Sequence, residues 1–182
     1  LPNKPLGVAL IGTGFMGKTH VFGFATAPRV FDLPYEPVLH SVADRSPELA
    51  ASAASALGFR HGTDDWRRLI DNPEIDVIDI TAPNALHKEM ALAAIAAGKH
   101  VYCEKPLAPL AADAREMTLA AEAAGVKTQV GFNYLCNPML GLAREMIAAG
   151  ELGEIRGYRG LHAEDYMADP AGPWTFRHDP AG

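Results

Sequence analysis

The 182-residue sequence contains little cysteine, no concentration of positive charge and no long apolar run. Its two cysteines, Cys103 and Cys136, are far apart and follow no metal-binding spacing, so we expect no metal site and a reducing, cytoplasmic compartment. The formal net charge of -6, without a cluster of Lys and Arg, argues against a nucleic-acid partner. The apolar runs are too short to cross a bilayer and the first residues lack a signal-peptide pattern, so we expect no membrane association.

The rest of the composition is that of an ordinary globular protein, with 48% hydrophobic and 21% charged residues. Short apolar runs of strand length alternate along the chain with segments of helical pattern. The expected strands cover residues 7–12, 37–45, 75–83, 100–106 and 127–134, with a brief one near 59–63, and the main helices cover 15–27, 46–57, 84–98, 110–125 and 138–150. This order predicts an α/β fold, a parallel sheet with helices on both faces.

Several residues mark the expected helix ends. Ser46 is a helix cap followed by Pro47 at the first helical position, and Asn84 is a candidate cap for a later helix. Pro28 is expected to end the first helix. The stretch 28–37 contains three prolines and predicts a loop insertion.

The first expected strand runs into a glycine-rich turn that opens a helix. In this position backbone N–H groups and the helix dipole face a bound pyrophosphate. The glycines of a GxGxxG turn allow the tight bend, the approach of the phosphate and the packing of helix on strand. The candidate cofactor contacts are therefore Gly12, Thr13, Gly14, Phe15, Met16 and Gly17.

Asp44 follows the second expected strand, where a dinucleotide site needs an acid for the ribose hydroxyls. Its distance from Gly17 is longer than usual, and we attribute the excess to the proline-rich insertion. The Asp44 carboxylate repels a 2′-phosphate and so favours NAD, whereas the Arg45 guanidinium can bind that phosphate or stack on adenine. We therefore predict NAD as the cofactor, with NADP as the alternative.

Four stretches carry a more specific signal: GTGFMG at 12–17, TAPNALHKEMALAAIAAGKHVYCEKPLA at 81–108, GFNY at 131–134 and GPWTFRHDPAG at 172–182. With them the chain resembles the glucose-fructose oxidoreductase, inositol dehydrogenase and rhizopine-catabolism family, written Gfo/Idh/MocA. The resemblance implies a Rossmann domain and an NAD(P)-dependent oxidoreductase. Such an enzyme transfers a hydride between nicotinamide and a hydroxyl-bearing carbon of a sugar, cyclitol or similar polyol.

In this family the lysine of Glu-Lys-Pro lies beside the nicotinamide and the substrate oxygen, which gives Lys105 a catalytic role by resemblance. An ammonium at the carboxyl end of a strand can stabilise negative charge on that oxygen. Glu104, a cofactor-binding candidate like Lys105, is expected to pair with Lys105 or to contact the nicotinamide ribose. Pro106 is expected to fix the turn, with a cis peptide bond before it.

The resemblance implies further cofactor contacts, which by position are Thr81, Pro83, Asn84, His87, Asn133, Trp174 and Arg177. Other roles stay open for three of them: Asn84 as a helix cap, His87 as a surface residue of a helix and Trp174 as a buried indole. Leu135 stands where the family often has Arg, which weakens the case for a substrate contact there.

Residues 1–150 are expected to form the dinucleotide-binding Rossmann domain, and 151–182 the beginning of an α+β substrate and oligomerisation domain that is cut short. The stretch 154–167 predicts its opening strand. The family's usual acid–base pair, an Asp and a His in a DxGxH-like stretch, does not occur in this chain. By resemblance, the whole protein is expected to be a homo-oligomer.

Two functions of different class stay open at this point. The chain is either the front part of a dehydrogenase, with Lys105 as one of its catalytic groups, or a nucleotide-binding module that binds NAD(P) without turnover. A methyltransferase-like site shares the glycine turn and the acid after the second strand, but the Glu-Lys-Pro motif argues against it.

Overall fold

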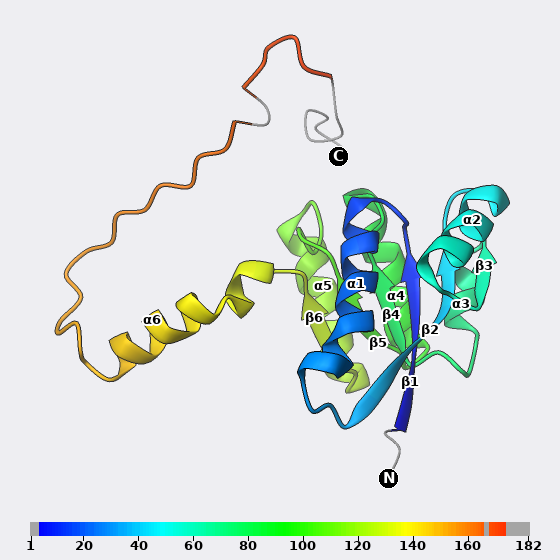
Figure 1. Cartoon of the computed structure of the whole chain (residues 1–182), viewed down its shortest axis with the longest axis horizontal. Coiled ribbons are helices and arrows are strands. Elements are labelled where there is room, and N and C mark those ends of the chain that lie inside the picture. Colours follow the sequence, from blue (N-terminus) through cyan, green and yellow to red (C-terminus); the bar gives the residue numbers. More distant parts are fainter. Residues whose placement is uncertain (1–3, 166–167, 174–182) are drawn as a thin grey trace. The chain divides into compact units, whose positions relative to one another are not determined.

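The computed structural model describes residues 4–165 and 168–173. Six strands form one sheet of parallel neighbours in the order β3-β2-β1-β4-β5-β6 (Figure 1). The strands are β1 (Lys4–Ile11), β2 (Tyr35–Ala43), β3 (His61–Thr63), β4 (Val77–Ile80), β5 (His100–Cys103) and β6 (Thr128–Val130). The helices are α1 (Phe15–Val30), α2 (Pro47–Leu57), α3 (Arg67–Ile70), α4 (His87–Ala96), α5 (Ala111–Ala124) and α6 (Pro138–Ala148), with 3-10 helices η1 (Asn84–Leu86) and η2 (Asn133–Cys136). The strand order reverses beside β1, which confirms the predicted Rossmann arrangement.

Residues of the sheet alternate between two buried faces, and helices cover both. On β1, Leu10 packs with Val21 of α1 and Ala54 of α2, whereas Ala9 and Ile11 belong to a cluster on the other face. That second cluster includes residues of α4 and α5, among them Met90, Ala94, Met117 and Ala121. Burial on both faces explains why the strands read as nearly continuous apolar runs.

The carboxyl ends of the parallel strands meet at one edge of the sheet. Backbone pairing continues one residue beyond the strands, since the Thr81 N–H donates to Ile11 O and the Glu104 N–H to Ile80 O, each at 2.9 Å. The residues that follow β1, β4 and β5 therefore lie side by side. They do so where the strand order reverses, which is where open α/β sheets bind ligands.

The predicted helix signals are confirmed at α2 and wrong at α4. Ser46 Oγ accepts a backbone hydrogen bond at the start of α2, and Gly58 ends that helix in the left-handed conformation, with φ of 82°. Asn84 caps no helix: it lies in η1, α4 begins three residues later, and neither has a side-chain cap. The short 3-10 turn occupies the place where the cap was expected.

The predicted end of the first helix at Pro28 is wrong. Helix α1 continues through Pro28 to Val30. A proline this close to the end of a helix removes one backbone hydrogen bond, and the helix still ends with a bond from the Phe31 N–H to Ala27 O at 2.9 Å. The loss is therefore confined to the last turn.

The predicted loop insertion at 28–37 is wrong for the same reason. Strand β2 begins at Tyr35, and Pro37 is paired with Leu6 inside the sheet, so the connecting loop covers only residues 31–34. A long α1, rather than a loop, accounts for the separation between the glycine turn and Asp44.

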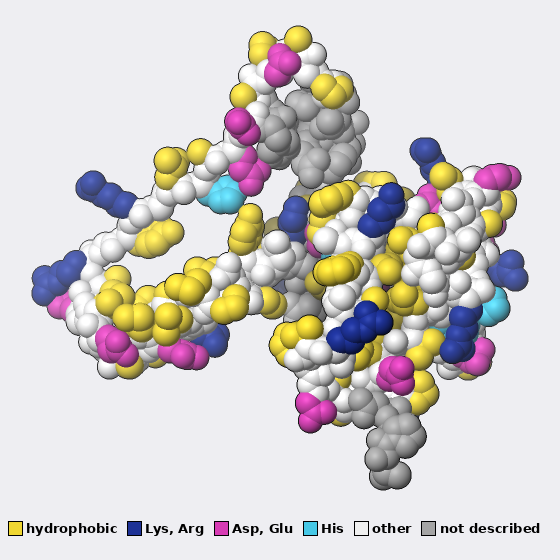
Figure 2. Space-filling view, in the orientation of Figure 1, with side chains coloured by type: hydrophobic (Ala, Val, Ile, Leu, Met, Phe, Trp, Pro, Cys, Tyr) yellow, Lys and Arg dark blue, Asp and Glu magenta, His cyan; other side chains and the backbone are white. Residues whose placement is uncertain are grey.

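The chain divides into two units, Leu1–Gly131 and Phe132–Gly182. The second unit contains η2 and α6, and α6 exposes a row of apolar side chains (Figure 2), among them Met139, Leu140, Leu142 and Ile147. The strand predicted at 154–167 is wrong where it can be judged, because residues 154–165 form neither helix nor strand. An isolated strand needs a partner, and the described part of this unit contains none.

The predicted domain boundary at 150–151 concerns the organisation of the whole protein and stays a prediction. Within the described residues, no helix has the length and apolar character needed to span a membrane.

Candidate functional site

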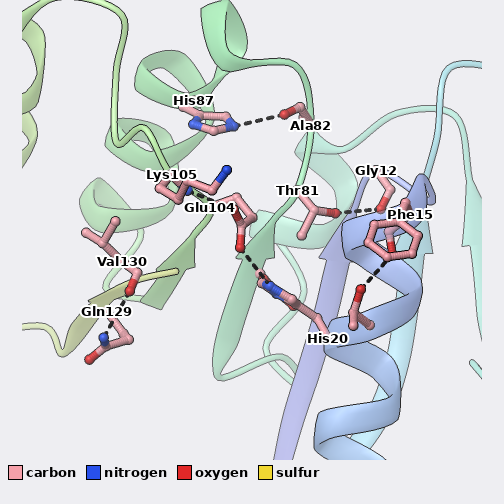
Figure 3. Close-up of polar contacts among 12 residues, drawn as sticks. Gly12, Phe15, His20, Thr81, Ala82, His87, Glu104, Lys105, Gln129 and Val130 are labelled. Carbon is pink, nitrogen blue, oxygen red and sulfur yellow. Dashed lines mark hydrogen bonds and ion pairs between the residues drawn. The ribbon is translucent and has the colours of Figure 1, made fainter. Parts of the chain in front are cut away.

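The glycine turn that joins β1 to α1 is held by contacts with the neighbouring strand (Figure 3). Gly12 has φ of 98°, and a Cβ there would lie 2.8 Å from Thr81 O. A Cβ at Gly17 would lie 2.3 Å from Gly12 O, so the packing of the protein itself requires both glycines. Gly14 differs, because its φ of -65° is ordinary and a Cβ would meet nothing within 4 Å. The space over Gly14 is thus available to a ligand, as expected for the middle glycine of a dinucleotide turn.

The N-terminus of α1 is suited to an anionic group. Gly14 is its N-cap and supplies no side-chain acceptor to the first N–H groups of the helix. Phe15 is exposed and Met16 is half-buried in this first turn. The free donors and the positive end of the helix dipole both favour a phosphate at this place.

Asp44 contacts the glycine turn from the end of β2. Its Oδ2 accepts hydrogen bonds from the N–H of Thr13, at 3.0 Å, and from the Thr13 hydroxyl, and its Oδ1 accepts one from the Arg45 N–H at 2.7 Å. Partial burial acts to raise the pKa of Asp44, but the hydrogen bonds from Thr13 and Arg45 and the charge of Arg45 outweigh it and lower the pKa. An ionised carboxylate therefore lies beside the turn, and its contact with a ribose stays a prediction.

Thr81 ties the end of β4 to the turn. Its hydroxyl donates to Gly12 O at 2.7 Å (Figure 3), so its proton is already used within the protein. Pro83, which is exposed, and Asn84, which is half-buried, follow at the same edge of the sheet. Their predicted cofactor contacts are compatible with these positions and stay predictions.

The two charged side chains of the Glu-Lys-Pro turn diverge after β5 (Figure 3). Glu104 is 6% exposed and points at His20, whereas Lys105 is exposed, and among the described residues its ammonium has no ion-pair partner. The expected side-chain pair of Glu104 with Lys105 is therefore wrong: the buried Oε2 accepts the backbone N–H of Lys105 instead, at 3.0 Å. Buried carboxylates need close donors, and His20 and this N–H supply them. The Lys105–Pro106 bond is cis, as expected.

His20 of α1 lies between two buried carboxylates. Its Nδ1 is 2.9 Å from Asp79 Oδ1 and its Nε2 is 3.1 Å from Glu104 Oε1. The ring stacks on that of Tyr102, with centroids 4.6 Å apart and planes 10° from parallel. Asp79 and Tyr102 reach α1 because they alternate with Ile78 and other residues that point to the opposite face of the sheet.

The protonation of this cluster follows from its burial and its charges. Burial acts to lower the pKa of His20, but the hydrogen bonds and negative charges of Asp79 and Glu104 outweigh burial and raise it. Burial raises the pKa of Asp79, against the opposing hydrogen bond from His20. Both shifts favour a proton held between the two carboxylates.

Gly131, the first residue of the GFNY motif, lies against Glu104. A Cβ at Gly131 would lie 2.3 Å from Glu104 Oε1 and 2.8 Å from its Cδ. Any larger residue would displace the carboxylate that faces His20. The position of Glu104 thus explains why glycine occurs here.

His87 supports the same turn from the other side. It has no exposed surface, so the alternative of a surface histidine is wrong. Its Nδ1 lies 3.0 Å from Pro106 O and its Nε2 lies 2.9 Å from Ala82 O (Figure 3). Both acceptors are backbone carbonyls, so the ring joins the segment after β4 to the segment after β5. Each ring nitrogen thus faces a backbone carbonyl, to one of which a neutral imidazole donates, so His87 packs between the two segments and this geometry gives no support to its predicted cofactor contact.

Three predicted contacts lie outside the unit that forms this edge. Asn133 lies in η2, in the second unit, and is exposed. Trp174 and Arg177 lie outside the described residues. Their cofactor contacts stay predictions.

The sequence analysis missed His20 and Asp79. One signal was present: Asp79 is a charged residue inside an otherwise apolar strand, and a buried carboxylate requires a partner. Its distant partner on α1 cannot be read from a linear pattern.

Residues 6–132 match the family model of GFO_IDH_MocA, described as oxidoreductase family, NAD-binding Rossmann fold. The chain belongs to the Gfo/Idh/MocA family. Levoglucosan dehydrogenase of Pseudarthrobacter phenanthrenivorans is 44% identical to this Gfo/Idh/MocA chain over 180 residues, which are 97% of the chain and 46% of that protein. Inositol 2-dehydrogenase of Pseudomonas fluorescens is 31% identical over 181 residues, which are 96% of this chain and 52% of that protein.

A solved structure of levoglucosan dehydrogenase in complex with NADH and levoglucosan superposes with a TM-score of 0.95 and 43% identity. The match covers 98% of this Gfo/Idh/MocA chain and 48% of the other. The chain therefore spans about half the length of these relatives. Family membership confirms the resemblance and removes the methyltransferase-like alternative.

Proposed function

We propose that this Gfo/Idh/MocA chain forms the nucleotide-binding half of an NAD(P)-dependent oxidoreductase. The reaction transfers a hydride between nicotinamide and a hydroxyl-bearing carbon of a sugar, cyclitol or similar polyol. The observation that carries the proposal is the open space over Gly14, in a turn whose other two glycines are required by packing. The exposed ammonium of Lys105 at the end of β5 supports the catalytic part of the proposal.

The residues at this edge fit a dinucleotide. The N-terminus of α1 would hold the pyrophosphate, and Asp44 would accept hydrogen bonds from the adenosine ribose. The carboxylate is ionised, which disfavours a 2′-phosphate and supports NAD over NADP. The dinucleotide, when bound, supplies the nicotinamide that accepts or gives the hydride.

Lys105 would act on the substrate oxygen. Oxidation of a CH–OH group transfers a hydride from carbon to nicotinamide and a proton from oxygen to a base, which by resemblance belongs to the Asp–His stretch that does not occur in this chain. Negative charge develops on the substrate oxygen as the proton leaves. An ammonium within hydrogen-bond reach stabilises this charge. Glu104 is turned away toward His20, so the cation of Lys105 is not neutralised by its neighbour in sequence.

The substrate class rests on the relatives. One is named for levoglucosan and has been solved with that sugar and NADH, and another is named for inositol. Their range supports a hydroxyl-rich ring as substrate without selecting one compound. Homo-oligomerisation of the whole protein stays part of this proposal.

The alternative is a module that binds NAD(P) without turnover. The two proposals share the cofactor site and differ only in whether the 182 residues suffice for hydride transfer.

Binding and turnover are tested separately. We expect NADH to bind the purified chain more tightly than NADPH when each titration is followed by fluorescence. Incubation with NAD and levoglucosan or inositol then tests turnover through the absorbance of NADH, with Lys105→Ala as the inactive control. NADH formation that depends on Lys105 supports the dehydrogenase, and binding without formation supports the module. Failure to bind either nucleotide contradicts both.

A further inference from the structure

Three ionisable side chains are buried together behind the Glu-Lys-Pro turn: Asp79, His20 and Glu104. Burying charge is unfavourable, and apolar residues can often replace a buried ion network without loss of stability. Stability alone therefore does not account for the cluster. Its contacts lead to the backbone of Lys105.

We propose that His20 is a positioning residue, whose ring fixes the Glu104 carboxylate and, through it, the backbone of Lys105 at the ligand edge of the sheet. The importance of that position rests on the proposed function. The contacts themselves involve no ligand.

The His20 ring has a single well-defined orientation. Asp79, in the middle of β4 and with no exposed surface, holds Nδ1 through both carboxylate oxygens, at 2.9 and 3.0 Å. Tyr102 of β5 stacks on the face of the ring. An anchor on one central strand and a stacking partner on the next leave Nε2 pointing at Glu104.

Glu104 transmits this orientation to the turn. Its Oε1 faces His20 and its Oε2 accepts the N–H of Lys105. Gly131 lies so close to Oε1 that the carboxylate has no room to move in that direction. On the other side of Lys105, the carbonyl of Pro106 is held by His87. The residue before Lys105 and the residue after it are thus each held by a buried histidine.

The test measures the Lys105 amide directly, by hydrogen exchange in the nucleotide-free chain. His20→Phe keeps a ring that can stack on Tyr102 but removes both nitrogens. We expect exchange of the Lys105 amide to become at least about tenfold faster, the change expected for losing one hydrogen bond to a charged group. The Thr81 amide, which donates to Ile11 O, reports global unfolding, so its exchange should change only by the difference in the free energy of unfolding between the two proteins, and the Lys105 amide should change by more.

Two further variants sharpen the test. His40→Phe alters another buried histidine, which contacts Ser41 and Glu74, and should leave the Lys105 amide unchanged. Gly131→Ala places a Cβ against Glu104 Oε1, the oxygen that faces His20, and should accelerate exchange as His20→Phe does, which provides a second route if His20→Phe does not fold. Unchanged exchange at Lys105 in whichever of the two variants folds would overturn the proposal.

A binding arm separates this inference from the proposed function. If the wild-type chain binds NADH, His20→Phe alone should weaken NADH binding. In a chain that already carries Glu104→Ala, the same substitution should cause no further loss of affinity, because both changes act through one carboxylate. Additive effects would contradict the inference. If the wild-type chain does not bind NADH, the proposed function fails, and the exchange experiment still decides the role of His20.

Discussion

His20 Nε2 lies 3.1 Å from Glu104 Oε1, so the first helix of the fold contacts the residue that precedes Lys105, 84 positions later in the chain. The contact crosses the point where the strand order reverses, because α1 follows β1 and Glu104 follows β5. It links the two parts of the candidate site, the glycine turn that would hold the phosphates and the lysine that would face the substrate.

Gly17→Ala should destabilise the chain. The added Cβ would lie 2.3 Å from Gly12 O, and overpacking of this kind costs about 1–3 kcal/mol. Gly23→Ala on the same helix is the matched control, since nothing lies within 4 Å of its Cβ and loss of a helical glycine stabilises by roughly 0.5–1 kcal/mol. Urea denaturation measures both variants. A Gly17→Ala variant as stable as the wild type would contradict the packing described for the turn.

Asp44→Ala should weaken NADH binding and reduce the preference for NADH over NADPH. Losing hydrogen bonds to an ionised group costs about 1.5–3 kcal/mol, or roughly tenfold to a hundredfold in affinity. Removing the negative charge also removes the repulsion of a 2′-phosphate. Asp32→Ala, at an exposed site after α1, is the control and should bind as the wild type does. An unchanged nucleotide preference in Asp44→Ala would show that Asp44 does not contact the bound nucleotide.

The stability that His20 contributes should be lost as pH rises. Its pKa is raised above 6.5 in the folded chain by Asp79 of β4 and Glu104 at the end of β5. The contribution is therefore complete below about pH 6.5 and disappears as pH passes the folded-state pKa. Because the pKa of Asp79 is also raised, the contribution of Asp79 to stability is likewise lost as pH rises, over a lower pH range.

Urea denaturation of the wild type and His20→Phe checks this dependence. The difference in the free energy of unfolding between the two proteins should decrease from about pH 6 to about pH 9, because groups remote from His20 contribute equally to both proteins. A difference that is constant or grows over this range would show that His20 is not protonated between the carboxylates.

Cys103 should resist alkylation in the native chain. Burial, followed by the negative charges of Asp79 and Glu104, raises the pKa of its thiol to about 12. Cys136 is exposed and should react. Mass spectrometry should find one modification in the native wild type, none in native Cys136→Ser, and two in the denatured wild type. Rapid labelling of native Cys103 would contradict its buried position.

Local features of the fold were predictable because neighbours in sequence determine them. The cap at Ser46, the glycine that ends α2 and the turn between β1 and α1 all follow from short-range hydrogen bonds and allowed dihedral angles. Pro28 misled the prediction because its effect depends on its distance from the end of the helix, which packing sets. The strand expected from residue 154 failed because a strand depends on partners that the described chain does not supply.

The candidate site was predictable in location but not in its connections. Asp44 was found because it follows the second strand, and Lys105 through the resemblance of its Glu-Lys-Pro motif to the family; both lie at one edge because the strands are parallel. The pairing of Glu104 with His20 was not found, because adjacent charges in sequence suggested a pair with Lys105. Choosing between these partners requires knowing which side of the turn is buried, a property of the assembled sheet.

The central claim, that a dinucleotide binds over Gly14, is tested most directly by NADH titration of the wild type and Gly14→Val. The substitution adds a side chain to open space, at a φ of -65° that any residue adopts, so the variant should fold, with stability lowered only by the modest cost of valine at a helix N-cap. We predict saturable NADH binding by the wild type and at least about a tenfold loss in the variant, since extra methyl groups forced against a packed partner cost about 1–3 kcal/mol. Equal NADH affinity of the wild type and the folded variant would contradict the account.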